Sequence, residues 1–209
     1  FQMCRDVVIR RCTFSDNTGN GLHPGAGSTN VMFDDCDSHD NGNCGLFFCV
    51  RANYISVRGS RFTGNGTGVS IGTRDCHNLI EDCVVDGNAG AGVLVRPSPR
   101  PVEVHSCHVR RCTIAGNVGK RGQGQVEIVT QAHDLIFEGN TVSGRQGAGQ
   151  DKPGFFVEST ARHIHLDGNR VQGCSREVDA ASESLAAAPS LFECGYDSGS
   201  ETIYRHLPI

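Results

Sequence analysis

The chain has 209 residues, of which 27 are glycine and none is tryptophan, and its formal net charge is −4. A nucleic-acid-binding protein would carry a basic excess, and no apolar run approaches the roughly 20 residues that span a bilayer. The sequence therefore predicts no nucleic-acid partner and no membrane span.

A repeated phrase begins near residue 9 and recurs along most of the chain. Each copy has an apolar residue, two polar residues and a Cys, Ser or Asn. In five copies an Asn follows five residues later, before a Gly-rich turn. The copies start 23 to 29 residues apart, at Ile9, Phe33, Val57, Ile80, Val109, Phe137 and Leu166.

This repeat predicts the fold. One copy of short alternating strands cannot bury its apolar side alone, whereas copies stacked about 4.8 Å apart form a continuous core. Propeller blades need about 40 residues each. We therefore expect an all-β fold, a right-handed parallel β-helix of about seven coils. The coils would occupy residues 1–175, and 176–209 would form an irregular C-terminal cap with a partial extra coil. Because Phe1 begins in mid-pattern, we expect an upstream domain of a longer chain or a partner at that edge.

The Cys or Asn of each copy should point inward and stack on its equivalents. Cysteine in such a column acts as a small buried hydrophobe, so we expect reduced thiols there and no disulfides. Cys76 and Cys107 do not fit a metal-binding spacing such as CxxC, and no metal site is predicted from them. The column comprises Cys12, Cys36, Ser60, Cys83, Cys112, Asn140 and Asn169.

The strand after each Gly-rich turn should carry the functional face. Its inward residues are Leu22, Leu46, Val69, Val93, Val126 and Phe155, and its outward residues are His23, Phe47, Ser70, Leu94, Glu127 and Phe156. Three insertions, 96–100, 118–125 and 145–154, should rim this face, and long loops on a regular scaffold are where sites are usually built. Arg51 and Arg74 should stack on adjacent coils of the same face.

The strand before the Cys column shows a different outward pattern. Six of its seven positions alternate in the sign of their charge, and opposite charges on neighbouring strands attract. We interpret this face as a structural surface. The column runs through Arg10, Asp34, Arg58, Glu81, Arg110, Glu138 and Asp167.

Three segments carry a resemblance to known proteins: Gly21-Leu22-His23-Pro24-Gly25, Ser38-His39-Asp40-Asn41 and Gly45-Leu46-Phe47-Phe48. With these motifs the chain resembles the right-handed β-helix repeat proteins of the pectate-lyase-like superfamily. The layout of residues 20–95 is similar to mannuronan C5-epimerase modules. His23 and Gly25 stand where those enzymes have the Asp and His of their catalytic Asp-Pro-His motif. The resemblance implies a polysaccharide or oligosaccharide partner, a lyase or epimerase reaction and an extracytoplasmic bacterial location.

Both reactions begin with removal of the C5 proton next to a uronate carboxylate. A cation must neutralise the carboxylate, and a base must take the proton. The predicted catalytic residues are His23, Arg51, Arg74 and Glu127, with His23 or a loop lysine exchanging protons. The predicted substrate-binding residues are Phe47, Asp75, Arg96, Lys120, Arg121 and Glu158, with Phe47 packing on a sugar ring and Asp75 as an alternative partner for Arg74.

Other functions are open from the sequence. Glu127 and Glu158 could form the carboxylate pair of a glycoside hydrolase. The chain could also be a non-catalytic glycan-binding or structural module of a longer protein. No cofactor is certain, and Ca²⁺ is a candidate through Asp34, Asp35, Asp37 and Asp40. His163 and His165, which alternate on one strand, are a weaker metal candidate.

Overall fold

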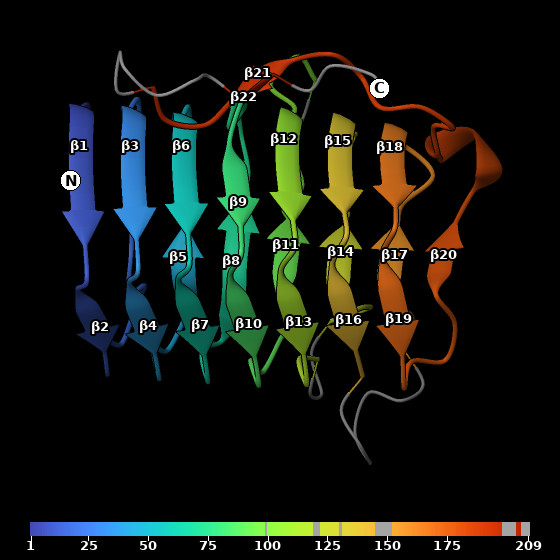
Figure 1. Ribbon diagram of the computed structural model, residues 1–209, viewed down its shortest axis with the longest axis horizontal. Coiled ribbons are helices and arrows are strands. Elements are labelled where there is room, and N and C mark those ends of the chain that lie inside the picture. Colours follow the sequence, from blue (N-terminus) through green and yellow to red (C-terminus); the bar gives the residue numbers. More distant parts are fainter. Residues whose placement is uncertain (99, 119–121, 130, 145–151, 198–203, 206–209) are drawn as a thin grey trace.

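The computed structural model describes residues 1–98, 100–118, 122–129, 131–144, 152–197 and 204–205. Within this part, the chain winds through three parallel β-sheets, and each coil contributes one strand to each sheet except the first, which joins sheet C only by a bridge from Leu22 to Leu46 (Figure 1). Consecutive strands in a sheet belong to consecutive coils, so every pairing between coils is parallel. This arrangement is the predicted β-helix of about seven coils.

The bounds of the strands follow the repeat. Sheet A contains β1 (Arg5–Arg10), β3 (Thr29–Asp34), β6 (Asn53–Arg58), β9 (Leu79–Glu81), β12 (His105–Arg110), β15 (His133–Glu138) and β18 (Arg162–Asp167). Sheet B contains β2 (Thr13–Ser15), β4 (Asp37–His39), β7 (Arg61–Thr63), β10 (Val84–Asp86), β13 (Thr113–Ala115), β16 (Thr141–Ser143) and β19 (Arg170–Gln172). Sheet C contains β5 (Cys44–Phe47), β8 (Thr67–Ile71), β11 (Val93–Val95), β14 (Val126–Ile128), β17 (Phe155–Val157) and β20 (Val178–Ala180).

The core lies inside the three sheets and repeats from coil to coil. Alternation along each strand sends every second side chain inward, where it meets the same position of the next coil. The expected inward column of sheet C is buried from Leu22 to Phe155. Sheet A supplies the opposite wall through residues such as Phe33, Val57 and Phe137.

A ladder of asparagines closes the turn between sheets B and C. The Asn41 Nδ2 donates to Asn65 Oδ1 at 2.9 Å, and the ladder continues through Asn88 to Asn117. The insertion at 118–125 interrupts the pattern, and Gln125 takes the next place by accepting from the Asn117 backbone N–H at 3.0 Å. Amide side chains thereby satisfy backbone groups that the turns leave buried.

The cysteine column agrees with the prediction except at its first member. Cys36, Cys83 and Cys112 are buried, and all eleven cysteines are free thiols. Cys12, expected to be buried, is exposed. The reason is that Cys12 lies next to β2, an edge strand of sheet B. Among the described residues, β2 pairs only with β4.

The charged column of sheet A forms ion pairs between neighbouring strands, as predicted, from Arg10 to Arg110. Arg10, Asp34, Arg58, Glu81, Arg110 and Glu138 lie directly opposite one another on successive strands. Glu81 is only 3% exposed, and it binds Arg58 Nε at 2.8 Å, Arg110 at 2.7 Å and Arg111 at 2.8 Å. This face therefore satisfies its own charges.

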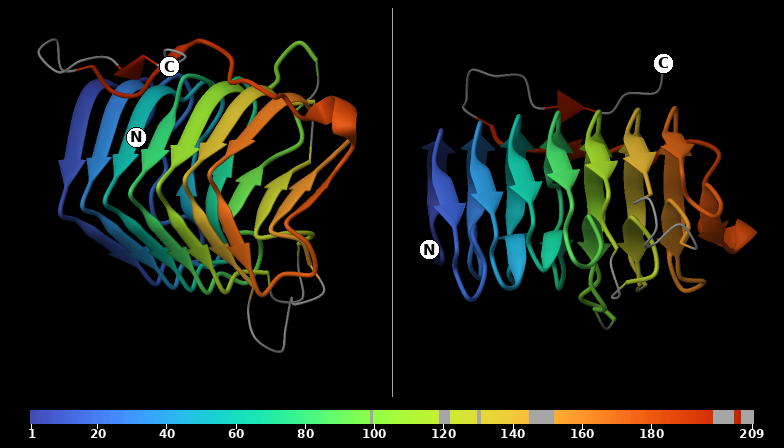
Figure 2. Two further views of the ribbon diagram at one scale, coloured as in Figure 1. Left: turned by 45° about the vertical axis from the view of Figure 1, so that its right-hand side comes forward. Right: turned by 90° about the horizontal axis from the view of Figure 1, so that it is seen from below.

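The C-terminal segment leaves the coils after β20 and runs back along sheet A (Figure 2). It contains the 3₁₀ helix η1 (Ser182–Ser184), β21 (Glu193–Cys194) and β22 (Tyr204–Arg205). Three backbone N–H groups fix it: Gly195 donates to His77 O, Tyr196 to Ser56 Oγ and Asp197 to Asn30 Oδ1. Among the described residues, there is no helix with the length and hydrophobicity of a membrane span.

Candidate functional site

The outward column of sheet C has the predicted register. Leu22 pairs with Leu46, which places His23 beside Phe47, and Phe47 is followed by Ser70, Leu94, Glu127 and Phe156 on successive strands. The insertions at 96–100, 118–125 and 145–154 directly follow or precede strands of this sheet. Sheet C therefore carries a column in which His23 is exposed, Phe47, Leu94 and Phe156 are half-buried, and Ser70 and Glu127 are buried.

Arg96 is the cation that organises this column. It follows β11, and its side chain folds back across Gly72, where a Cβ atom would collide with the guanidinium. One terminal nitrogen donates to Ser70 Oγ at 2.9 Å and the other to the Phe48 carbonyl at 2.8 Å. The guanidinium carbon lies 4.1 Å from the centre of the Phe47 ring, a cation–π contact.

His23 completes a three-residue cluster with Phe47 and Arg96. Its ring meets Phe47 edge-on, with 5.2 Å between the ring centres, and it is exposed to solvent. Partial burial lowers the pKa of His23, and the positive charge of Arg96 lowers it further. The imidazole is therefore neutral near pH 7 and has a lone pair that can accept a proton.

Asp75 lies beneath the cluster, fully buried. Its two oxygens accept from the backbone N–H groups of Ala52 at 2.9 Å and Gly72 at 2.7 Å. Burial raises the pKa of Asp75 to about 7, against the opposing effect of these N–H groups and of Arg96. The expected pairing of Asp75 with Arg74 is wrong: its described cationic neighbour is Arg96, 3.9 Å away.

Arg51 and Arg74 lie in equivalent turns of neighbouring coils, where the Arg51 N–H donates to the Thr73 carbonyl at 3.1 Å. Both are exposed and have positive φ, 63° and 59°, in the turn that follows the sheet C strands. Neither forms an ion pair with any described residue. Phe47, expected to be an exposed aromatic, is half-buried because Arg96 covers it.

The two glutamates of the expected carboxylate pair have different surroundings. Glu127 is only 6% exposed, and its Oε1 accepts from the backbone N–H groups of Gln123 at 2.6 Å and Gly124 at 3.3 Å. Burial raises the pKa of Glu127. Glu127 thus fastens the inserted loop, whereas Glu158 is half-buried just beyond β17. Lys120 and Arg121 lie outside the described residues.

Two of the four aspartates considered for Ca²⁺ have other partners. Asp34 pairs with Arg10 at 3.1 Å, and Asp40 accepts from His39 at 2.8 Å. Among the described residues these acidic groups do not converge on one point where three ligand atoms could meet. His163 and His165 also diverge, the first toward Asp134 and the second toward the Ala186 carbonyl.

A second group of side chains, which the sequence reasoning missed, lies at the start of sheet A. The ring of Tyr54 stacks on His77 at 4.8 Å, His77 meets His105 edge-on at 5.6 Å, and His105 stacks on His133 at 5.2 Å. Burial and the neighbouring histidines lower the pKa of His105. The signal was present in the sequence, since these histidines recur at 28-residue intervals, one coil apart.

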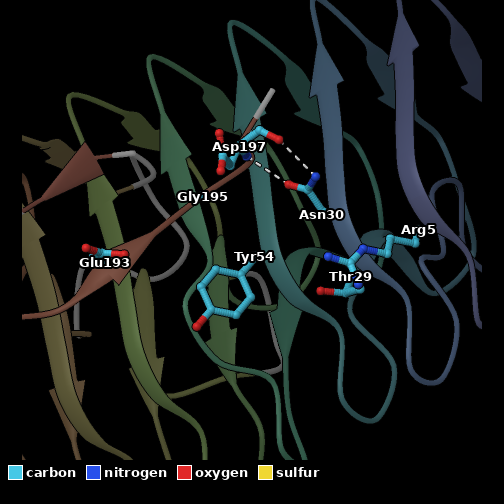
Figure 3. A pocket seen from close by; sticks show the side chains of 7 residues that line it. All are labelled: Arg5, Thr29, Asn30, Tyr54, Glu193, Gly195 and Asp197. Carbon is cyan, nitrogen blue, oxygen red and sulfur yellow. Dashed lines mark hydrogen bonds between the residues drawn. The ribbon is translucent and has the colours of Figure 1, made fainter. Parts of the chain in front are cut away.

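A pocket of about 190 Å³ adjoins this group (Figure 3). The sheet A strands supply one wall and the C-terminal segment supplies the other, with Tyr54 and Glu193 on facing sides. The lining residues are Arg5, Thr29, Asn30, Tyr54, Glu193, Gly195 and Asp197.

Two solved structures share the architecture. The A-module of the mannuronan C-5 epimerase AlgE4 from Azotobacter vinelandii superposes with a TM-score of 0.63 at 13% identity, covering 88% of this chain and 58% of that one. A mutant of the periplasmic alginate epimerase AlgG superposes with a TM-score of 0.65 at 12% identity, covering 88% of this chain and 46% of the other. The chain thus spans about half the length of these structures, and at such identities the likeness shows the fold alone.

The sequence comparisons identify a family but no individual curated relative. No curated protein sequence matches the chain. The family described as "Right handed beta helix region" matches residues 1–142, which is more than half of the chain. With the three parallel sheets and the stacked asparagines, this match shows that the chain belongs to the right-handed β-helix family.

Proposed function

We propose that the protein binds an acidic, uronate-containing polysaccharide across sheet C and abstracts the C5 proton of a bound uronate, as a lyase or an epimerase. The cluster of His23, Phe47 and Arg96 is the observation that supports this proposal. In it, a neutral imidazole and a fixed cation both contact one aromatic ring.

Arg96 is the residue that would hold the uronate carboxylate. A guanidinium has five N–H groups, and Arg96 uses two of them on Ser70 and Phe48. The remaining donors can form charge-assisted hydrogen bonds with a carboxylate. Burial lowers the pKa of Arg96, so its charge is partly desolvated. A partly desolvated cation attracts a carboxylate more strongly than a hydrated cation does, and this would favour uronate binding.

His23 is the residue that would take the proton. Neutralising the carboxylate makes the adjacent C5 proton easier to remove, and a neutral imidazole is a suitable base near pH 7. His23 occupies the place of the Asp in the motif that the chain resembles, so the proposal assigns the proton transfer to an imidazole instead of that motif's residues.

Exposed groups around the cluster would extend the binding site. Arg51 and Arg74 have no ion-pair partner among the described residues and can meet carboxylates of neighbouring sugars. Glu158 lies just beyond β17 of the same sheet. Lys120 and Arg121, which precede β14 in the sequence, are proposed as further binding residues. One structural relative is a periplasmic alginate epimerase, which supports an extracytoplasmic location as part of this proposal.

The hydrolase alternative has less support. A carboxylate acting as acid or nucleophile must reach the glycosidic bond, whereas the Glu127 carboxylate is engaged by two backbone N–H groups beneath a loop. A non-catalytic glycan-binding module remains the competing function, and it differs from the proposal only in the proton transfer.

Deuterium exchange separates these functions. The protein is incubated in D₂O with polymannuronate, polyguluronate or polygalacturonate, while NMR follows deuterium at C5 and absorbance follows unsaturated products. The proposal predicts exchange or unsaturation that falls at least about 100-fold in His23→Gln, the scale of general-base catalysis. His39→Gln, on sheet B, is the matched control and keeps the rate. Binding without exchange would identify a non-catalytic module, and absence of binding to all three polymers would overturn the proposal.

A further inference from the structure

We infer that Cys76, His77 and His105 form a binding site for a divalent transition-metal ion of the zinc class, at the corner between sheets C and A. One donor atom of each residue lies within 4.8 Å of the other two. This site is separate from the sheet C cluster and does not depend on the proposed reaction.

The fold brings these ligands together from two coils. Cys76 and His77 lie in the turn that precedes β9, and Cys76 pairs in parallel with His105, the first residue of β12. The 29-residue separation of Cys76 and His105 equals one coil in this part of the chain. Neighbouring positions on stacked coils therefore supply both nitrogen ligands and the sulfur.

The chemistry of the three side chains fits zinc better than calcium or magnesium. Thiolate and imidazole are the ligands that Zn²⁺ and Co²⁺ prefer, whereas Ca²⁺ and Mg²⁺ take oxygen. A tetrahedral ion needs its ligand atoms about 3.3–3.7 Å apart, given usual metal–ligand lengths. All three residues are half-buried, so small side-chain rotations can close the remaining gap.

A hydrogen bond already orients His77 for coordination. Its Nδ1 lies 2.7 Å from the Glu193 carbonyl oxygen, which can only accept, so Nδ1 carries the proton. Nε2 is then the nitrogen with the free lone pair. Metal-binding histidines usually donate their second nitrogen to a carbonyl or carboxylate in this way.

Coordination would change the bonding of Cys76. Its thiol donates to Asn53 Oδ1 at 3.3 Å in the structure. On binding, the sulfur–hydrogen bond breaks, a sulfur–metal bond forms and the proton passes to solvent. The ion would thereby connect two coils and, through His77, the C-terminal segment at Glu193.

Three protein ligands leave one position of a tetrahedral ion open. Tyr54, which stacks on His77, and Glu193, whose carbonyl binds His77, both line the pocket of about 190 Å³. A water molecule or a small anionic ligand in that pocket is the chemical class that fits the open position.

Titration with Co²⁺ in the absence of other metals tests this inference. A thiolate-to-cobalt charge-transfer band should grow to one equivalent per chain, together with visible bands of tetrahedral intensity. Cys76→Ser should abolish the charge-transfer band. His77→Gln and His105→Gln should each weaken cobalt affinity at least about 100-fold, because losing a ligand costs more than losing a residue that only hydrogen-bonds to a ligand. Zn²⁺ should displace the cobalt.

Cys174→Ser is the matched control, because Cys174 is also half-buried but follows β19, the terminal strand of sheet B, in a later coil. Its titration should be unchanged, and circular dichroism should show that each variant keeps the β-fold. A band that persists in Cys76→Ser, or one equally reduced in Cys174→Ser, would overturn the site. If Cys76→Ser fails to fold, unchanged cobalt affinity in His105→Gln would overturn it equally.

Discussion

The guanidinium carbon of Arg96 lies 4.1 Å from the centre of the Phe47 ring. Phe47 is in β5 and Arg96 follows β11, and β8 lies between these two strands in the sheet. The side chain spans this distance because Gly72 provides no obstacle and because Ser70 and Phe48 accept its hydrogen bonds. A cation is thus fixed on sheet C beside His23, which is the basis of the proposed function.

Adding a methyl group at Gly72 should displace Arg96. The new Cβ would occupy the place of the guanidinium, so Gly72→Ala should lose both hydrogen bonds and the contact with Phe47. We expect the free energy of unfolding to fall by about 1–3 kcal/mol in a urea titration. Gly19→Ala is the control, since a Cβ there meets nothing within 4 Å. Equal stability of the two variants would show that Arg96 is not held as described.

Glu81 should dominate the stability of the charged column on sheet A. Glu81→Gln removes the buried partner of Arg58, Arg110 and Arg111, and we expect a loss of about 2 kcal/mol or more. Asp34→Asn breaks a more exposed pair with Arg10 and should cost under about 1 kcal/mol. Urea unfolding at low and high salt measures both; the reverse order of losses would contradict this assignment.

The repeat made much of this fold predictable, because stacking depends on residue positions that recur at one-coil intervals. The asparagine ladder and the sheet A charges follow from such columns. Exposure was less predictable where the columns end or are interrupted. Cys12 is exposed because its coil is stacked on one side only, and Glu127 is buried because an insertion folds over it.

The candidate site was predicted only in part, for a physical reason. The columns correctly place His23 next to Phe47, but they give no information about a long side chain that reaches across two coils. Arg96 does so, and its contacts with Ser70, Phe48 and Phe47 depend on the length of its side chain. The contacts of Glu193 and Asp197 with sheet A are non-periodic, so no repeat could reveal them.

Asp75 should make stability depend on pH. Its pKa of about 7 in the folded protein lies above the ordinary value of about 3.9, so between these pH values the native state holds a proton that the unfolded chain has lost. The contribution of Asp75 to the free energy of unfolding therefore falls as pH rises through this window, by at most about 1.4 kcal/mol per pH unit. The difference between wild type and Asp75→Asn in urea unfolding should show this slope. A difference that stays constant or rises with pH would exclude it.

The cysteine column should be visible in its reactivity. Cys12 is exposed whereas Cys83 is only 1% exposed, and hydrogen bonding with Cys112, together with burial, raises the pKa of Cys83 well above its usual value. Iodoacetamide should therefore modify Cys12 in the native protein, while Cys83 should react only after unfolding. Mass spectrometry of peptides from both states measures this. Similar rates for the two thiols, or a disulfide at Cys83, would contradict the stacked arrangement.

The most direct test of the central claim is calorimetric binding of matched oligosaccharides to wild type and Arg96→Gln. The account predicts that an oligouronate binds wild type more tightly than a neutral oligosaccharide of equal length. Arg96→Gln should reduce the oligouronate affinity by a factor of about 10–100, the range for a charged hydrogen bond, without affecting the neutral ligand. Arg111→Gln, which alters a cation of sheet A, should leave both affinities unchanged. Equal affinity for acidic and neutral chains, unaltered by Arg96→Gln, would contradict sheet C as an acidic-glycan site.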